Sequence, residues 1–387
     1  MEFDALVVGC GFSGAVCARV LAEEYGLRVR IIDKRNHIAG NMYDELDEHG
    51  ILVHRYGPHI FHTNSEEAFS YIKPFSEWFF YEHRVLGRIK NKLVPIPFNF
   101  KSIDTLFSAE KAESLKAKLP AAFPGREKVT VSELIAAPDS ELAELGRFVF
   151  DYVFKNYTAK QWGTPVETLD SGVINRVPVV LSYDDRYFQD AIQMTPKDGF
   201  TALFENLLDH PNISVALGCD AKLHLSLDAD AGTMQFDGRP FNGICIYTGP
   251  ADELFDFAYG ALPYRSLHMV FEHHEKTSFQ PASVVNYPND GDFTRITEFK
   301  KLTAQKKSGS TTVMYEYPRA YVRGSVEAGI PYYAILNDDN RALHAKYAAL
   351  AEKIPGLYLC GRLADYAYYN MDAAILAALR LARSVVK

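Results

Sequence analysis

The chain begins with an apolar run, a glycine-rich loop and a longer amphipathic stretch. Residues 5–8, Ala-Leu-Val-Val, are typical of a buried parallel strand. The pattern after the glycines predicts a helix from about Ser13 to Tyr25. Arg28–Ile32 is predicted to be a second strand, which ends at Asp33. This order of elements indicates an α/β fold.

Helical periodicity dominates residues 64 to about 175. We expect Ser102 and Ser132 to cap helices, because each precedes a helical pattern with an acid near the third position. Residues 85–100 instead predict a hairpin with Lys90-Asn91-Lys92 as its turn. The helical patterns are clearest at 64–81, 102–119, 130–137 and 140–162.

The second half of the chain mixes strand and helix patterns. Short strand patterns occupy residues 176–200 and 265–335, and residues 201–260 again look α/β. The C-terminus predicts a strand at Leu357–Cys360, an aromatic loop and a helix from about Met371. We therefore predict a discontinuous Rossmann-like domain (1–63, 201–260 and 336–387), a mostly helical insert (64–175), and a mixed, antiparallel sheet domain lining a substrate cleft (176–200 and 261–335).

Composition narrows the possible functions. Of 387 residues, 48% are hydrophobic and 23% are charged, which is ordinary for a globular protein. The net charge of −8 argues against nucleic-acid binding. The five cysteines form no C-x-x-C pair, so we expect a reduced, cytoplasmic protein. No signal peptide is recognised, and no apolar run approaches the roughly 20 residues of a membrane span.

The loop Gly9-Cys10-Gly11-Phe12-Ser13-Gly14 predicts a dinucleotide site. Gly9 allows a tight turn, Gly11 lets the backbone approach a pyrophosphate at the helix N-terminus, and Gly14 lets helix and strand pack closely. Asp33 can hydrogen-bond the adenosine ribose. The loop alone is a weak signal, and its position between strand and helix makes it stronger.

Two further features favour FAD over NAD. After Asp33 the chain runs from Lys34 to Gly40-Asn41, which resembles the flavoprotein turn of small residues around the pyrophosphate. The predicted C-terminal strand, aromatic loop and helix lie at the far end of the chain from the glycine loop. Flavoproteins with this type of dinucleotide-binding fold use such a C-terminal segment to close over the flavin. The N-terminus of the last helix can offset negative charge on a reduced isoalloxazine ring.

Three histidines, His54, His59 and His62, fall within nine residues and resemble a metal site. Zinc normally takes four ligands in a suitable geometry. No cluster of acids or cysteines accompanies these histidines, so we expect no metal. The alternatives are contact with a flavin or a purely structural role.

Several motifs occur in order along essentially the whole chain. They are GCGFSG (9–14), YGPHIFHT (56–63), YTAKQW (157–162), NRVPV (175–179), FTRITEFK (293–300), PYY (331–333) and GRLADYAYYNMD (361–372). Together these motifs resemble the bacterial, flavin-dependent UDP-galactopyranose mutase family. The resemblance implies an isomerase that reversibly contracts UDP-galactopyranose to UDP-galactofuranose by covalent catalysis through N5 of reduced FAD, without net redox change. It also implies a role in bacterial surface polysaccharide synthesis.

The resemblance assigns one group of residues to the flavin. His59 is implied to contact the isoalloxazine region. The implied cofactor-binding residues are Gly9, Gly11, Phe12, Ser13, Gly14, Asp33, Lys34, Gly40, Asn41, His59, Ile60, Gly361, Arg362, Tyr369, Asn370 and Met371.

A second group is assigned to the substrate. Arg176 and Arg295 match phosphate-binding arginines that stabilise charge on departing UDP, and with His62 they are the implied catalytic residues. Tyrosine hydroxyls would reach the phosphates, and an aromatic helix face with Trp162 on a closing loop would hold uridine and sugar. The implied substrate-binding residues are His83, Phe154, Tyr157, Thr158, Trp162, Asn175, Arg176, Tyr187, Asn286, Arg295, Tyr333 and Tyr368.

The chain departs from the family at Asn370, where many bacterial members carry Asp, and at His83, where others often carry Asn. The implied partners are UDP-galactose in both ring forms, NADH or NADPH as reductant, and a second copy in a homodimer. An FAD-dependent oxidoreductase of the amine-oxidase-like superfamily shares the architecture and is the main alternative. A flavin-dependent binding module is another. The paired arginines and clustered tyrosines fit a nucleotide diphosphate better than an amine or a lipid.

Overall fold

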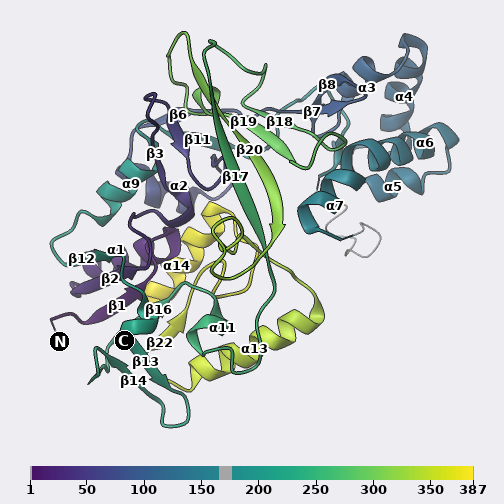
Figure 1. Cartoon of the computed structure of the whole chain (residues 1–387). Coiled ribbons are helices and arrows are strands. Elements are labelled where there is room, and N and C mark those ends of the chain that lie inside the picture. The colour runs from purple at the N-terminus through teal and green to yellow at the C-terminus, as the bar shows by residue number, and fades with distance from the viewer. Residues whose placement is uncertain (1, 165–176, 387) are drawn as a thin grey trace.

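The computed structural model describes residues 2–164 and 177–386 (Figure 1). Within these residues, one layer is a five-stranded parallel sheet in the order β12–β2–β1–β16–β22. Its strands come from the two ends and the middle of the chain, which confirms an α/β, Rossmann-like fold. They are β12 (Ile213–Leu217), β2 (Val29–Asp33), β1 (Ala5–Val8), β16 (Ile244–Tyr247) and β22 (Leu357–Leu359).

The first helix packs against the last one beside this sheet (Figure 1). The predicted strand Ala5–Val8 is confirmed and is buried throughout. Helix α1 (Phe12–Glu23) ends two residues before its predicted end, and α14 (Met371–Val385) begins at its predicted residue. The buried positions of α14 recur every three or four residues, which gives it one apolar face. Other helices around this layer are α9 (Gly199–Leu208), α10 (Ala221–His224), α11 (Ala251–Leu254) and α13 (Asp338–Glu352).

A second sheet bridges this layer and the helices of residues 100–162 (Figure 1). Its described strands follow the order β21–β17–β20–β19–β18–β7–β8. The predicted hairpin is confirmed, and Lys90 and Asn91 have the positive φ angles of a tight two-residue turn. The strands are β21 (Tyr333–Ala334), β17 (Tyr264–His274), β20 (Thr311–Ala320), β19 (Arg295–Glu298), β18 (Val284–Asn286), β7 (Val85–Ile89) and β8 (Lys92–Ile96).

The hairpin lies within the predicted helical insert (64–175) but pairs with a strand of the predicted sheet domain. β7 pairs in parallel with β18, so a segment assigned by sequence to the helical insert belongs to the large sheet. β12 and β16 lie within residues 201–260 and β22 lies within 336–387, and all three share the five-stranded sheet. The division into three domains remains a proposal.

The helices after the hairpin form a separate apolar core. They are α3 (Phe100–Leu106), α4 (Ala109–Ala122), α5 (Val131–Ile135), α6 (Ser140–Val149), a π-helix (Phe150–Lys155) and α7 (Asn156–Trp162). The two predicted N-caps are wrong. Asn99 caps α3 with Ser102 as its third helical residue, and Thr130 caps α5 with Glu133 in the same role, so Ser132 lies inside the helix.

The predicted helix at 64–81 is only partly correct. α2 (Glu66–Ile72) and a 3₁₀ turn (Lys73–Phe75) are followed by a strand, β6 (Trp78–Phe80). β6 pairs with β11 (Ile192–Pro196), which also pairs with β5 (Phe61–Thr63) and places His62 opposite Gln193. Pairing with a strand more than a hundred residues away overrides the local helical pattern.

The remaining elements are short. They are a 3₁₀ turn (Gly40–Met42), α12 (Phe299–Leu302), and the strands β3 (Asp44–Leu46), β4 (Leu52–His54), β9 (Lys128–Val129), β10 (Val179–Val180), β13 (Leu225–Asp228), β14 (Thr233–Phe236) and β15 (Arg239–Pro240). In the described part of the chain, none of the helices has the length and apolar character needed to cross a membrane.

Candidate functional site

The glycine loop between β1 and α1 has no space for side chains at two positions. A Cβ on Gly14 would lie 1.9 Å from the carbonyl oxygen of Gly9, and a Cβ on Gly9 would lie 2.0 Å from Oγ1 of Thr248. Gly40 approaches Gly11 so closely that its Cβ would lie 2.9 Å from the Cα of Gly11. The two glycine turns therefore meet above the N-terminus of α1, which no side chain caps.

Asp33 supports this loop from the end of β2. Its carboxylate accepts hydrogen bonds from the backbone N–H of Cys10 at 2.8 Å and from that of Arg35 at 2.9 Å. Lys34 points elsewhere, because its Nζ lies 3.7 Å from Glu253 and its side chain is 58% exposed. The role of Lys34 in cofactor binding remains a prediction, and the next residue, Arg35, lies beside the second glycine turn.

Arg35 lies beside the second glycine turn. Its Nη2 donates to Oδ1 of Asn41 at 2.9 Å, and its guanidinium lies 4.5 Å from the centre of the Tyr56 ring. Its Nη1 is buried without a hydrogen-bond partner among the described residues. A buried donor of this kind normally has an acceptor, so this atom points to an anionic ligand.

The C-terminal loop closes the same end of the site. Gly361 follows β22 with a φ of 115°, and a Cβ there would lie 2.7 Å from Oγ of Ser13. The guanidinium of Arg362 lies 4.7 Å from the centre of the Tyr368 ring and 5.4 Å from that of Tyr333. These two rings stack at 5.8 Å with an angle of 9°.

A cavity of about 620 Å³ extends from this loop to the large sheet. Fourteen of the predicted site residues line it. They are Asn41, His59, Ile60, His62, His83, Tyr187, Asn286, Arg295, Tyr333, Arg362, Tyr368, Tyr369, Asn370 and Met371. The structure therefore brings together residues that are up to 330 positions apart in the sequence.

The three clustered histidines have different environments. His54 is 1% exposed, and its Nδ1 accepts a hydrogen bond from the backbone N–H of His59 at 3.0 Å. Burial lowers the pKa of both side chains, so both are neutral near pH 7. Nδ1 of His59 is buried without a hydrogen-bond partner among the described residues. Within that part of the chain, no three His, Cys, Asp or Glu side chains are arranged to hold a metal.

His62 forms a hydrogen bond with Asp190 at the cavity wall. Its Nδ1 lies 2.8 Å from Oδ2 of Asp190, and its ring stacks on Phe188 at 3.6 Å. Asp190 and Phe188 also line the cavity, and neither was predicted from the sequence. A carboxylate next to a histidine is a common arrangement in acid–base sites, but the two residues are 128 positions apart.

Arg295 is held by Glu316 on the neighbouring strand β20. Its Nη2 and Nε donate to Oε2 of Glu316 at 2.7 and 2.9 Å. Burial alone would lower the pKa of Arg295, but Glu316 and the nearby hydroxyls of Tyr157 and Tyr333 outweigh it and raise the pKa. The arginine is therefore a permanent cation at the cavity wall.

His83 and Asn286 add uncommitted polar atoms to the cavity. Nδ1 of His83 and Oδ1 of Asn286 are buried without hydrogen-bond partners among the described residues. Burial, with Arg295 and His62 nearby, lowers the pKa of His83 to about 3, so this ring is neutral. Two buried polar atoms without partners in one wall indicate that a polar ligand supplies their hydrogen bonds.

The predicted uridine wall lies beside the cavity and does not line it in the described residues. Phe154 and Thr158 are buried, at 8% and 7% exposure. Tyr157 lies near Arg295 and Tyr333, and burial raises its pKa. The π-helix changes the predicted helical register around Phe154, and such bulges occur often at functional sites. Trp162 is the last residue of α7.

Asn175 and Arg176, two of the predicted substrate residues, lie outside the described residues. The described chain resumes at Val177, which lines the cavity together with Pro178.

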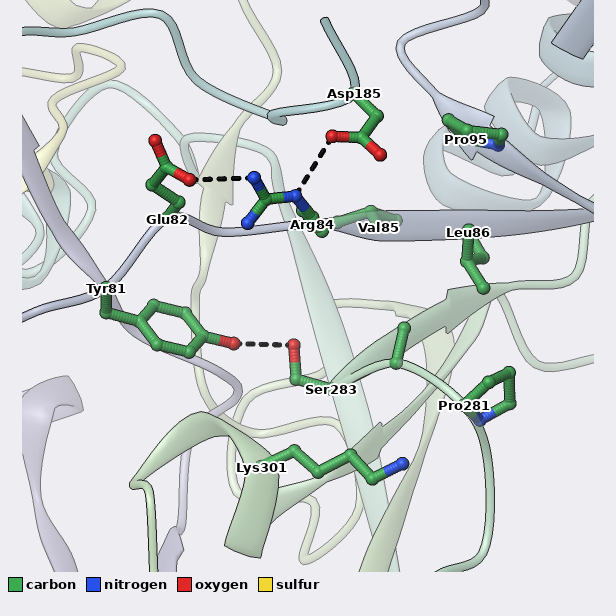
Figure 2. A pocket seen from close by; sticks show the side chains of 11 residues that line it. Tyr81, Glu82, Arg84, Val85, Leu86, Pro95, Asp185, Pro281, Ser283 and Lys301 are labelled. Carbon is green, nitrogen blue, oxygen red and sulfur yellow. Dashed lines mark hydrogen bonds and ion pairs between the residues drawn. The ribbon is translucent and has the colours of Figure 1, made fainter. Parts of the chain in front are cut away.

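A second, smaller pocket of about 340 Å³ lies between residues 81–86 and 281–283 (Figure 2). Its polar groups are already paired. Arg84 contacts Glu82 at 2.7 Å and Asp185 at 2.9 Å, and the hydroxyl of Tyr81 donates to Ser283 at 2.7 Å. The larger cavity, which has several buried polar atoms without partners, is the better candidate for a binding site.

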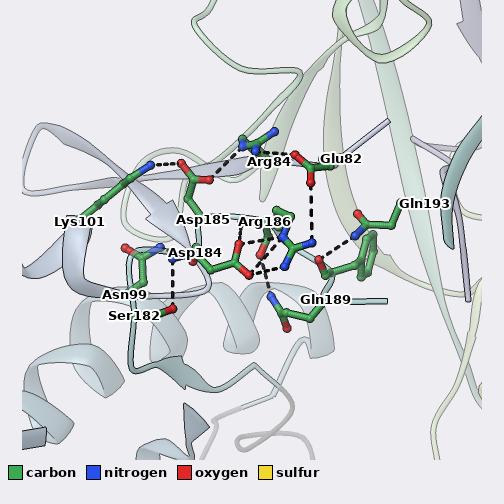
Figure 3. A network of polar contacts seen from close by, with 11 residues as sticks. Glu82, Arg84, Asn99, Lys101, Ser182, Asp184, Asp185, Arg186, Gln189 and Gln193 are labelled. Atoms are coloured by element: carbon green, nitrogen blue, oxygen red, sulfur yellow. Dashed lines mark hydrogen bonds and ion pairs between the residues drawn. The ribbon is translucent and has the colours of Figure 1, made fainter. Parts of the chain in front are cut away.

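The charges around Arg84 hold the segment 182–190 that carries the unpredicted cavity residues (Figure 3). Asp185 bridges Arg84 and Lys101, while Arg186 pairs with Asp184 at 2.7 Å. Single exposed ion pairs stabilise little, but several that share partners can fix a segment.

The sequence matches known families over most of its length. A family described as UDP-galactopyranose mutase matches residues 152–368, and one described as NAD(P)-binding Rossmann-like domain matches residues 7–75. The chain is 37% identical over 390 residues to UDP-galactopyranose mutase of Mycoplasma pneumoniae, covering 100% of this chain and 97% of the relative. It is 33% identical over 384 residues to dTDP-fucopyranose mutase of Escherichia coli, covering 99% and 98%.

Solved structures agree on the fold. The chain is similar to a crystal structure of reduced UDP-galactopyranose mutase with a TM-score of 0.72, at 16% identity and with 99% and 95% of the two chains covered. It is similar to a putrescine oxidase with a TM-score of 0.60, at 12% identity and with 99% of each chain covered. At these identities the structures establish a shared architecture.

Proposed function

Because the chain belongs to the UDP-galactopyranose mutase family, we propose that it interconverts UDP-galactopyranose and UDP-galactofuranose with reduced FAD bound. The reaction would be reversible, and the redox state of the flavin would not change. One observation carries the proposal for this chain's own residues. A single cavity joins the glycine turns to a buried arginine–carboxylate pair and stacked tyrosines.

The residues present fit FAD. A Cβ at Gly9 or Gly14 would clash with Thr248 or with the Gly9 carbonyl, so this tight turn requires glycine, and the first turn of α1 carries no capping side chain that would compete with a pyrophosphate. Arg35, His59 and Arg362 each have a buried nitrogen without a protein partner among the described residues. These donors run from the glycine turns into the cavity, as an extended dinucleotide would.

Ring contraction sets the chemical requirements of the site. The bond from the anomeric carbon to UDP must break and form again, and the ring oxygen must change from O5 to O4. Bound reduced FAD would supply N5 as the nucleophile for the anomeric carbon. The protein must hold the separated UDP and move a proton between two sugar hydroxyls.

We assign the diphosphate to Arg295, supported by Tyr187, Tyr333 and Tyr368. A permanent cation opposite a departing diphosphate stabilises the charge that develops during bond breaking. Arg176 is proposed as the second cation from its motif alone. The resemblance places uridine against Phe154, Tyr157, Thr158 and Trp162.

We assign the sugar to the wall formed by His62, His83 and Asn286. Neutral His83 and the free carbonyl of Asn286 can each bond a sugar hydroxyl. His62 is the proposed proton carrier, because it lines the cavity and has a carboxylate partner. Opening of the ring would put a proton on O5, and closure would remove one from O4.

The resemblance further supports NADH or NADPH as the reductant, assembly as a homodimer and a place in the cytoplasm. The reductant would share the substrate cleft, because the sequence carries one G-x-G-x-x-G motif. Anaerobic bleaching of the flavin by either nucleotide would test the first point, and light scattering of the purified protein would test the second.

A turnover assay tests the proposed function. The flavin-bound protein is incubated with UDP-galactofuranose, with and without dithionite, and the nucleotide sugars are separated by chromatography. We expect UDP-galactopyranose only in the reduced sample. No conversion with reduced flavin present would contradict the proposal, and substrate-driven flavin reduction by amines would favour the oxidoreductase alternative.

The similarity to dTDP-fucopyranose mutase supports a second substrate for the same assay. That relative's name indicates a 6-deoxy sugar on a thymidine diphosphate. The two Mycoplasma relatives named for UDP-galactopyranose are 37% and 38% identical. We therefore expect a higher kcat/KM with the UDP-sugar than with the dTDP-sugar.

A further inference from the structure

The carboxylate of Asp190 contacts both His62 and Asn64. Oδ2 of Asp190 lies 2.8 Å from Nδ1 of His62, and Oδ1 accepts a hydrogen bond from Nδ2 of Asn64 at 2.7 Å. An ionised carboxylate accepts hydrogen bonds and has none to donate. Nδ1 of His62 therefore carries the proton in this pair.

The surroundings hold the pair in one geometry. β5 and β11 place His62 opposite Gln193, whose side-chain amide donates to the carbonyl oxygens of Asp190 and Phe188 at 3.1 Å each. The ring of Phe188 lies parallel to that of His62, with an angle of 12°. Asn64 also accepts from the backbone N–H of Ala191 at 2.9 Å, so both of its amide ends are fixed.

Nε2 is the remaining functional atom of the His62 ring. Among the described residues, no protein atom forms a hydrogen bond with it, and the side chain borders the cavity. Other titratable or charged side chains of the cavity wall include His83, on the segment before β7, Arg295 of β19, and Lys128 and Tyr187. His83 is neutral and Arg295 is permanently charged, so neither exchanges a proton near neutral pH.

We propose that Asp190 is a positioning residue that holds His62 in the tautomer with the proton on Nδ1 and so leaves Nε2 to exchange a proton with the sugar. This inference rests on the proposed function. When the ring opens, the electron pair of the C1–O5 bond stays on O5, which takes the Nε2 proton of the His62 imidazolium and leaves the neutral ring with its proton on Nδ1. When the ring closes, a lone pair of O4 forms the bond to C1, and Nε2, now an acceptor, takes the proton of the 4-hydroxyl. The two transfers balance and restore the imidazolium, while Asp190 keeps the Nδ1 proton in place throughout.

The first test reads the tautomer directly. The flavin-bound protein is labelled with ¹⁵N-histidine, its ring nitrogens are observed by NMR at alkaline pH, and the His62 signals are assigned by their loss in His62→Asn. We expect Nδ1 protonated and Nε2 bare. In Asp190→Asn the amide can donate to Nδ1, so the tautomer should invert. A proton on Nε2 in the unmodified protein, or the same tautomer in Asp190→Asn, would overturn the inference.

The second test measures turnover in the same variants. Asp190→Asn should lower kcat about 100-fold with KM changed less than about threefold, because acid–base groups typically contribute 100-fold or more. Asp190→Glu should recover part of that loss. The matched control is Asp184→Asn, which weakens the charged network of Figure 3 without touching His62.

The control separates positioning from structural support. We expect Asp184→Asn to keep the tautomer and to change kcat less than about threefold, as surface charge substitutions usually do. An equal loss of kcat in Asp184→Asn and Asp190→Asn would show that Asp190 only stabilises its segment, and would overturn the inference. The NMR test reads the tautomer of His62 without turnover. A failed mutase assay would therefore contradict the proposed function, whereas a wrong tautomer would contradict the role of Asp190. If Asp190→Asn does not fold, the tautomer of His62 in the unmodified protein still tests the inference.

Discussion

Arg295 and Glu316 lie opposite each other on β19 and β20, and two guanidinium nitrogens share one carboxylate oxygen. Glu316 is 1% exposed, whereas the Arg295 side chain is 24% exposed where it meets the cavity. The carboxylate thus fixes the cation from the buried side and leaves its other side available to a ligand. This arrangement suits a diphosphate that must be held before and after its bond to the sugar breaks.

Replacing Arg295 with methionine should affect turnover and stability together. We expect kcat/KM for the UDP-sugar to fall about 100- to 1,000-fold, the usual cost of losing one transition-state donor. The free energy of unfolding should fall by about 3 kcal/mol, because Glu316 is left as an unpaired buried carboxylate. Steady-state kinetics and urea denaturation measure the two effects.

Adding Glu316→Gln to Arg295→Met should separate these effects. Removing the unpaired charge should recover about 2 kcal/mol of stability, while turnover stays low because the cation is still absent. Recovery of turnover in the double variant would contradict the role of Arg295 as the diphosphate ligand.

Two glycines of the first loop should respond differently to alanine. A Cβ at Gly11 has no neighbour closer than 3.8 Å, and the residue has an ordinary φ of −86°. Gly11→Ala should leave the stability of the flavin-free protein within about 0.5 kcal/mol and raise the Kd for FAD about tenfold or more, because the methyl group occupies the path of the pyrophosphate. Gly14→Ala should destabilise the flavin-free protein itself by about 2 kcal/mol. Calorimetry of the flavin-free protein measures the stability of each variant, and a flavin titration measures its Kd for FAD. An unchanged FAD affinity in Gly11→Ala would contradict the assignment of the pyrophosphate to this loop.

Lys34 and Arg35 form a second pair for the flavin titration. Lys34→Ala should change the Kd for FAD less than about twofold, because its exposed amine faces Glu253. Arg35→Ala should weaken FAD about tenfold, because a buried donor and the contact with Tyr56 are lost. The reverse order would show that the motif assignment of Lys34 was correct.

Acid should destabilise the protein partly through His83. The pKa of His83 is about 3 in the folded chain and 6.5 in the unfolded chain, so between these values the unfolded chain binds more protons. Stability from this group is complete above pH 6.5 and is lost as pH falls, at about 1 kcal/mol per pH unit.

The variant His83→Asn should make the free energy of unfolding less dependent on pH between 4 and 6.5. Urea denaturation at several pH values measures this. His224→Asn, at a side chain that is 34% exposed, is the control. An unchanged slope in His83→Asn would show that this ring is not kept neutral by folding.

The dinucleotide unit could be predicted from the sequence because its signals are local. Residues 5–33 contain both strands, the helix and the glycines that join them, and each boundary lies within two residues of its prediction. The hairpin at 85–100 is also local, with its turn at Lys90 and Asn91. In these segments neighbouring residues decide the backbone.

The errors have non-local causes or depend on atomic detail. Trp78–Phe80 is a strand because β11 pairs with it, and the 64–81 pattern alone contains no trace of that partner. Asn99 and Thr130 replaced the expected caps, a difference of two or three residues that hydrogen-bond geometry decides. Asp190 contacts His62, which is 128 positions away, and Glu316 contacts Arg295 on a paired strand, so the sequence pattern around either acid does not reveal its partner.

The central claim is isomerisation without net oxidation, and one anaerobic measurement tests it most directly. Dithionite-reduced protein, freed of excess dithionite, is mixed with excess UDP-galactofuranose while the flavin absorbance and the sugar ¹H NMR signals are recorded together. The account predicts that pyranose signals replace furanose signals over many turnovers while the flavin stays reduced. Flavin oxidation in proportion to sugar consumed, or no pyranose with the flavin fully reduced, would contradict it.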